Sequence, residues 1–168
     1  MRQTKHSVLR RRASLSVAFG IIAMLAAAAG NASYNAQRAD ALIALSRDHA
    51  AHHRHDEAIA AIDEALQLQP NDPMLYLERG QRIMLIYEWD RALADYNRAI
   101  ALAPELPEAY YYRALLYASV PEGLDARRAA IADFERYLTL APEGEFAQAA
   151  AHSHVELAAL LEALSDRP

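Results

Sequence analysis

The sequence predicts an all-α protein made of antiparallel helix pairs, preceded by a separate apolar N-terminal segment. Two observations carry this prediction. A helix-patterned stretch that ends in proline occurs three times, and the first thirty residues differ sharply from the rest in charge and hydropathy. The chain has 168 residues, 54% of them hydrophobic, which suits one globular domain. It has no cysteine, which excludes disulfides, thiolate metal sites and catalytic thiols.

Residues 1–30 are expected to be a signal peptide or signal anchor. The first twelve residues hold five basic side chains and no acidic one, and residues 13–30 then read ASLSVAFGIIAMLAAAAG. A basic start, an apolar run and a small-residue end are typical of an export signal. The run also just reaches the length of a membrane span, so both cleavage and retention as an inner-membrane anchor over residues 13–29 stay open. Either outcome places the remainder in the periplasm or another extracytoplasmic space, with residues 31–38 as a linker.

The body of the chain is acidic. After the first twelve residues, 12 basic side chains face 22 acidic ones, a formal charge of −10. Such a body repels phosphate backbones, so nucleic-acid binding is not expected. The sequence has no GxSxG, P-loop or dinucleotide-binding glycine pattern. We therefore predict that the protein is not an enzyme, has no catalytic residues and needs no cofactor.

Three segments of the body repeat one pattern. They read DEAIAAIDEALQLQP, DRALADYNRAIALAP and RRAAIADFERYLTLAP, and end at Pro70, Pro104 and Pro142. The first two prolines are 34 residues apart and the third follows after 38. Each segment has helical apolar spacing, and the half-repeat before it is periodic too, so each repeat is predicted to be two packed antiparallel helices. The shared positions are a small residue (Ala58, Ala92, Ala130), a large residue (Ile62, Tyr96, Phe134) and an earlier small residue (Ser46, Gly80, Ala114).

These residues resemble the tetratricopeptide repeat (TPR) family, a helix-turn-helix repeat of 34 residues. The resemblance covers residues 39–142, and it implies a short right-handed solenoid of about seven helices. The repeats would occupy residues 39–72, 73–106 and 107–142. A capping helix and tail would follow over residues 143–168.

The sequence departs from the family pattern at several places. Tyr137 stands where the family has alanine, and His53 and Tyr87 stand where the inner turn commonly has glycine. Residues 120–125, VPEGLD, lengthen the inner turn of the third repeat. These departures affect loop geometry and packing near Tyr137 rather than the fold.

The resemblance implies that the first helices of the repeats line a concave groove that binds a protein or peptide partner. Lysine and asparagine, which hold a terminal carboxylate in some TPR proteins, are replaced here by residues such as Ile43, Leu77 and Tyr111, so an apolar or amphipathic segment fits the groove better. The alternative is that the chain's own linker or a second copy covers this face, which would make a homo-oligomer. The predicted groove residues are Ile43, Arg47, Met74, Leu77, Gln81, Met84, Tyr111 and Leu115.

Two aromatic clusters have simpler interpretations than ligand binding. In the run of three tyrosines, successive side chains point about 100° apart on a helix. We expect Tyr110 in the core, Tyr111 in the groove and Tyr112 on the flank. Trp89 opens the second helix of its repeat and is expected to be a packing anchor of the turn.

The stretch HAAHHRH holds His49, His52, His53 and His55. Imidazoles bind zinc and copper well, so a metal-binding protein on a TPR platform is one alternative function. The repeat register instead places His49 at a packing position and the other three around the inner turn of repeat one, so no metal is expected. The leading interpretation is an exported or membrane-tethered TPR scaffold or adaptor; a self-assembling TPR module is the other alternative.

Overall fold

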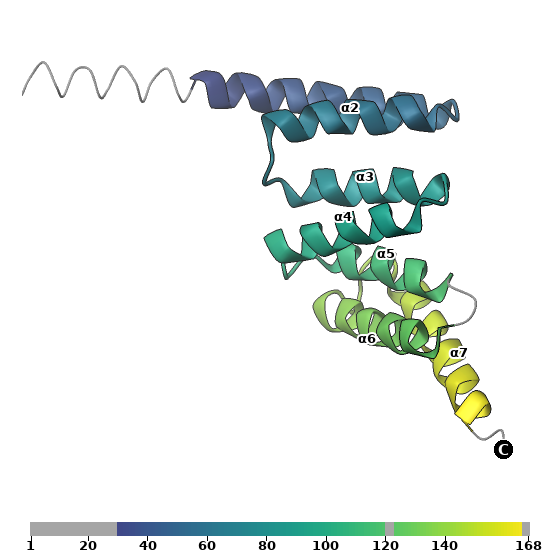
Figure 1. Ribbon diagram of the computed structural model, residues 1–168. Helices are drawn as coiled ribbons and strands as arrows, with labels where there is room; N and C mark the ends of the chain where they lie inside the picture. Colours follow the sequence, from purple (N-terminus) through teal and green to yellow (C-terminus); the bar gives the residue numbers. More distant parts are fainter. Residues whose placement is uncertain (1–29, 120–122, 166–168) are drawn as a thin grey trace, which may run out of the picture.

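The computed structural model describes residues 30–119 and 123–165, and seven helices lie within these residues (Figure 1). The predicted all-α class and helix number are confirmed. The predicted anchor over residues 13–29 lies outside the described part of the chain, and no helix within that part has the length and apolarity to cross a bilayer. The helices are residues 30–51, α2 (His55–Leu68), α3 (Pro73–Leu85), α4 (Trp89–Leu102), α5 (Pro107–Ala118), α6 (Leu124–Leu140) and α7 (Ala147–Ser165).

Residues 31–38, expected to be a linker, are helical and continue into the first helix of repeat one. After Gly30 this stretch contains neither proline nor glycine, and its asparagines and serine disfavour a helix by only about 0.7 kcal/mol each at most. Packing stabilises the same helix just after this stretch, since Ala39 is fully buried in a cluster with Ile62 and Leu75. Its N-terminal turns extend past the end of α2 (Figure 1).

Small residues let the two helices of a repeat approach each other. Ala58, Ala92 and Ala130 are all fully buried, as the repeat pattern predicts. In repeat two, a Cβ added at Gly80 would lie 2.6 Å from the Tyr96 ring, which is itself fully buried. Only glycine leaves room there, because the partner position carries the large tyrosine.

An arginine in the first helix of repeats two and three bridges two neighbouring helices. Arg79 in α3 donates two hydrogen bonds to Asp95 in α4, at 2.8 Å and 2.6 Å, and a third to Asp63 in α2, at 2.6 Å. The bond to Asp95 is the main cause of a raised pKa of the Arg79 guanidinium. Repeat three has the same arrangement, with Arg113 bonded to Asp133 (2.7 Å and 2.7 Å) and Asn97 (2.7 Å).

A tyrosine next to each bridge joins consecutive repeats. The hydroxyl of Tyr76 donates to the carbonyl of Pro70 at 2.9 Å, and Arg79 and Arg98 each lie within 6 Å of its ring. Tyr110 makes the same contacts with Pro104, Arg113 and Arg136. Repeat one differs at both positions. Leu42 stands where the later repeats have the tyrosine, and Leu45 stands where they have the arginine.

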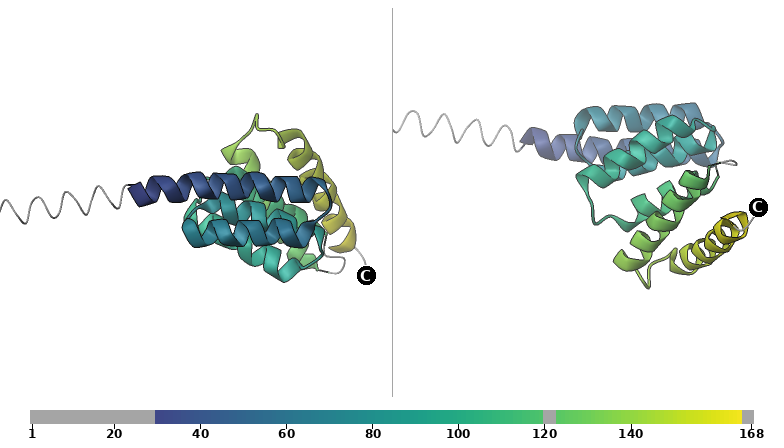
Figure 2. Two further views of the ribbon diagram at one scale, coloured as in Figure 1. Left: turned by 90° about the horizontal axis from the view of Figure 1, so that it is seen from above. Right: turned by 60° about the horizontal axis from the view of Figure 1, so that its bottom comes forward.

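The segment after the third repeat closes the end of the solenoid. α7 packs along α6, as the right view of Figure 2 shows, and its Ala150 is fully buried. The backbone N–H of Phe146 donates to the hydroxyl oxygen of Tyr137 at 2.9 Å. The Phe146 ring then stacks on Tyr111 with 4.4 Å between the ring centroids and 9° between the planes. Tyr137, the departure from the family pattern, thus positions the start of the capping helix.

Candidate functional site

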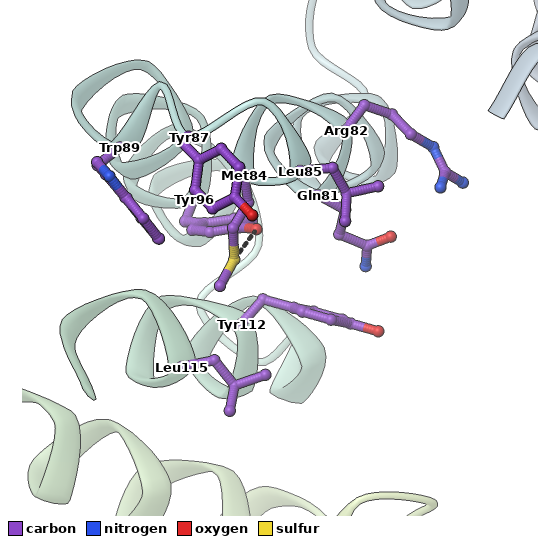
Figure 3. A pocket seen from close by; sticks show the side chains of 9 residues that line it. All are labelled: Gln81, Arg82, Met84, Leu85, Tyr87, Trp89, Tyr96, Tyr112 and Leu115. Atoms are coloured by element: carbon purple, nitrogen blue, oxygen red, sulfur yellow. Dashed lines mark hydrogen bonds between the residues drawn. The ribbon is translucent and has the colours of Figure 1, made fainter. Parts of the chain in front are cut away.

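The inner turn of repeat two brings aromatic residues to the end of α3. Tyr87 has a φ of 63°, in the left-handed region, and is 74% exposed. Its N–H donates to the carbonyl of Met84 at 3.2 Å. The Tyr87 and Trp89 rings meet edge to face, 5.8 Å apart. This tight turn places Trp89, the first residue of α4, on the side of the solenoid that faces α5 (Figure 3).

A pocket of about 420 Å³ lies between the helices of repeat two and α5 (Figure 3). We call it the Trp89 pocket. Its apolar end includes Met84, Trp89, Tyr96 and Leu115. The Tyr96 hydroxyl donates to the sulfur of Met84 at 3.7 Å, and burial raises the pKa of this hydroxyl, so the group stays neutral. The lining residues are Gln81, Arg82, Met84, Leu85, Tyr87, Trp89, Tyr96, Tyr112 and Leu115.

Polar groups gather at the other end of the Trp89 pocket. The polar tips of Gln81, Arg82 and Tyr112 lie at the end away from Trp89 (Figure 3). Arg82 has no hydrogen bond or ion pair with any other described residue, and its Nε is buried. Burial raises the pKa of the Tyr112 hydroxyl; the carboxylates of Glu145 and Glu108 raise it further, whereas Arg82 lowers it. The pocket therefore combines an aromatic end with a polar end whose charged lining residue is Arg82.

Three of the predicted groove residues line the Trp89 pocket: Gln81, Met84 and Leu115. Two others lie elsewhere on the surface. Met74 is 44% exposed, and Arg47 forms an ion pair with Glu78. Ile43 is half-buried and packs on the core cluster of repeat one.

The structure corrects the expected exposure of Leu77 and Tyr111, the apolar centre of the predicted groove. Leu77 is 2% exposed and belongs to a core cluster with Ile59 and Ile83. Tyr111 is 9% exposed because Phe146 lies flat on its ring. Helical spacing gives the direction of both side chains, but not the neighbouring elements that cover them.

Six pocket residues were not predicted from the sequence. Trp89 packs in its turn as expected and also lines the pocket, and Tyr112 stacks on Tyr96 with 6.3 Å between the centroids. Helical spacing could have indicated two of the six, because residues three or four apart lie on the same face of a helix. Leu85 follows the predicted Gln81 by four residues, and Tyr112 precedes the predicted Leu115 by three. The missed residues are Arg82, Leu85, Tyr87, Trp89, Tyr96 and Tyr112.

Of the four histidines of HAAHHRH, His53 and His55 contact each other, with their rings edge to face and 6.2 Å between the centroids. His52 uses its Nδ1 to contact the carbonyl of Asp48 at 2.8 Å, and His53 occupies the turn with a φ of 57°. The Nδ1 atoms of His49 and His55 are buried without a hydrogen-bond partner. Within residues 30–119 and 123–165, no group of three or more histidine and carboxylate side chains could hold a metal ion.

Comparison with protein-family models identifies one family. Sequence models described as tetratricopeptide repeat match residues 39–72 and 86–153. Among curated proteins, the chain is 30% identical over 105 residues to the human protein O-mannosyl-transferase TMTC1, an alignment that covers 60% of this chain but 12% of that protein. The chain thus spans about an eighth of the relative that it matches.

Solved structures show the same fold. The first TPR of Spaghetti (RPAP3) bound to an HSP90 peptide matches with a TM-score of 0.66 and 24% identity, covering 75% of this chain and 94% of that one. The TPR2B domain of yeast Sti1, in a complex with an Hsp70 peptide, matches with a TM-score of 0.67 and 19% identity, covering 74% and 98%. At these identities the likeness concerns the fold.

Proposed function

Because this chain belongs to the tetratricopeptide repeat family, we propose that it is a non-enzymatic adaptor that holds a protein or peptide partner in the Trp89 pocket. The observation that carries the proposal is the apolar pocket between repeats two and three, which already contains three of the predicted groove residues. Such a concave apolar site with a few polar groups is the usual form of a binding site. The peptide complexes of the Spaghetti and Sti1 domains support a peptide as the occupant.

Pocket occupancy can be measured directly, since Trp89 is the only tryptophan of the chain. A library of displayed peptides selected on the full-length protein provides binders, and titration of Trp89 fluorescence gives their affinity. We expect Leu115→Asp to weaken binding about tenfold or more, because loss of a leucine contact is worth ~1.5 kcal/mol or more.

The matched control is Leu160→Asp, a change of the same type at a 43%-exposed position of α7 that does not line the pocket. It should leave the affinity unchanged, and both variants should keep the helical circular dichroism. Equal binding by the Leu115→Asp variant and the unmodified protein would reject the pocket as the partner site. Leu77 and Tyr111 are unsuitable for this test, because aspartate at these buried positions would disrupt folding.

We further propose that the adaptor works outside the cytoplasm, either soluble in the periplasm after signal cleavage or anchored in the inner membrane by residues 13–29. The support is the sequence pattern of five basic residues followed by an uncharged apolar run. Cell fractionation with N-terminal sequencing tests this proposal. A mature N-terminus near residue 30 means cleavage, and an intact chain in the membrane fraction means anchoring. An intact chain in the cytosolic fraction would overturn export.

A further inference from the structure

We propose that the segment bound in the Trp89 pocket carries a bulky apolar side chain next to an acidic side chain, with the apolar group beside Trp89 and the carboxylate on Arg82. This inference rests on the proposed function, because it specifies the chemistry of the occupant of the same pocket. The polar and aromatic groups lie at opposite ends of one pocket (Figure 3), so a short segment laid across the pocket can contact both.

Arg82 supplies the charge complementarity. Most arginines in the described part of the chain already have a carboxylate partner, whereas Arg82 has neither an ion pair nor a hydrogen bond there, and its buried Nε lacks an acceptor. An unsatisfied buried donor is costly, and a charge-assisted hydrogen bond to a carboxylate is stronger than a neutral one. The arginines with a carboxylate partner include Arg47, Arg54, Arg79, Arg91, Arg113, Arg128 and Arg136.

The nearest carboxylate along α3 is not bonded to Arg82. Glu78 lies one helical turn before Arg82, a spacing that suits an ion pair, but its Oε1 accepts a hydrogen bond from Arg47 of repeat one, and its Oε2 is buried without a hydrogen-bond partner. The Arg82 Nε thus has no acceptor among the described residues. An acidic side chain that arrives with the apolar group would supply this acceptor.

The test uses synthetic peptides of one length, acetylated and amidated so that neither terminus is charged. Each carries a central leucine flanked by two glutamates, two glutamines or two lysines, and a fourth peptide has glycine in place of the leucine between two glutamates. Trp89 fluorescence of the full-length protein reports binding. We expect the glutamate peptide to bind at least about fivefold more tightly than the glutamine peptide, and the lysine and glycine peptides to bind most weakly.

Variants identify the residue responsible. Arg82→Gln should remove the preference for glutamate, and Arg82→Glu should reverse it in favour of the lysine peptide. Arg128→Gln, which removes the same charge from an exposed position on α6, is the control and should keep the preference. The preference of the unmodified protein should also shrink at high salt.

Each alternative result has a distinct meaning. Equal binding of the glutamate and glutamine peptides, or a glutamate preference that persists in Arg82→Gln, overturns the acidic partner but leaves the pocket as a peptide site. Binding that appears only when the C-terminal carboxylate is left free also overturns it, because the proposed acceptor is a side chain. If no leucine-containing peptide changes the Trp89 signal, the proposed function fails, and this inference fails with it.

Discussion

Arg79 and Asp95 form a bidentate pair in which the aspartate side chain is 6% exposed. A buried carboxylate that loses its only cation is left uncompensated, which typically costs ~3 kcal/mol or more. Arg79 also bonds Asp63, whose side chain is 45% exposed, and exposed pairs contribute about 1 kcal/mol at most.

We therefore expect Arg79→Met to lower the free energy of unfolding by about 3 kcal/mol and Asp63→Asn to lower it by less than about 1 kcal/mol. Urea unfolding followed by circular dichroism measures both. Comparable losses in the two variants would show that burial of Asp95 does not set the cost.

Gly80 faces the Tyr96 ring, and a methyl group there would lie 2.6 Å from ring carbon Cε1. We expect Gly80→Ala to destabilise the protein by about 2 kcal/mol through overpacking, despite the better helix propensity of alanine. Combining it with Tyr96→Leu should recover part of the loss. Gly30→Ala is the control, because nothing lies within 4 Å of its added Cβ, and it should be neutral or stabilising. A neutral Gly80→Ala variant would contradict the close approach.

His53 adopts a φ of 57° in an exposed turn, where a side chain is disfavoured by about 1 kcal/mol. We expect His53→Gly to raise the free energy of unfolding by ~0.5 to 1 kcal/mol, since glycine adopts this conformation without strain. His53→Ala should give no such gain, because alanine keeps the Cβ. Thermal unfolding compares the two, and an equal gain in both would exclude backbone strain as the cause.

Tyr137 fixes the start of the capping helix through its hydroxyl, which accepts the Phe146 N–H. Tyr137→Phe should cost about 1 kcal/mol for the lost hydrogen bond, and Tyr137→Ala about 4 kcal/mol, since the side chain is 1% exposed. The alanine variant should also speed proteolysis within α7. Unchanged proteolysis would show that α7 docks without Tyr137.

The sequence predicted the repeat core because its pattern lies within single helices. Ala58, Ala92 and Ala130 recur at one position before each proline, and all three are fully buried. The helical stretch at residues 31–38 was missed for a local reason. Asparagine and serine favour turns, but their cost in a helix is small once the next residues pack.

The Trp89 pocket could be predicted only in part, because it depends on how neighbouring repeats are placed. Gln81, Met84 and Leu115 follow from helical spacing, but Trp89 reaches the pocket through a left-handed residue in the preceding turn. Tyr111 was expected on the surface, and it is covered by Phe146, which lies 35 positions later in the chain. Spacing within one helix carries no information about such contacts.

Repeat one has Leu45 in place of the bridging arginine, and this difference has a consequence for local unfolding. Repeats two and three each hold their own two helices together with an arginine–aspartate bridge, whereas the described residues of helix 30–51 and α2 share no side-chain hydrogen bond. In a solenoid, each unit is stabilised by itself and by its neighbours alone, so the terminal unit with the weaker internal bonding opens first. Amide hydrogens of helix 30–51 should therefore exchange before those of α4 and α5, while the Trp89 pocket is still formed.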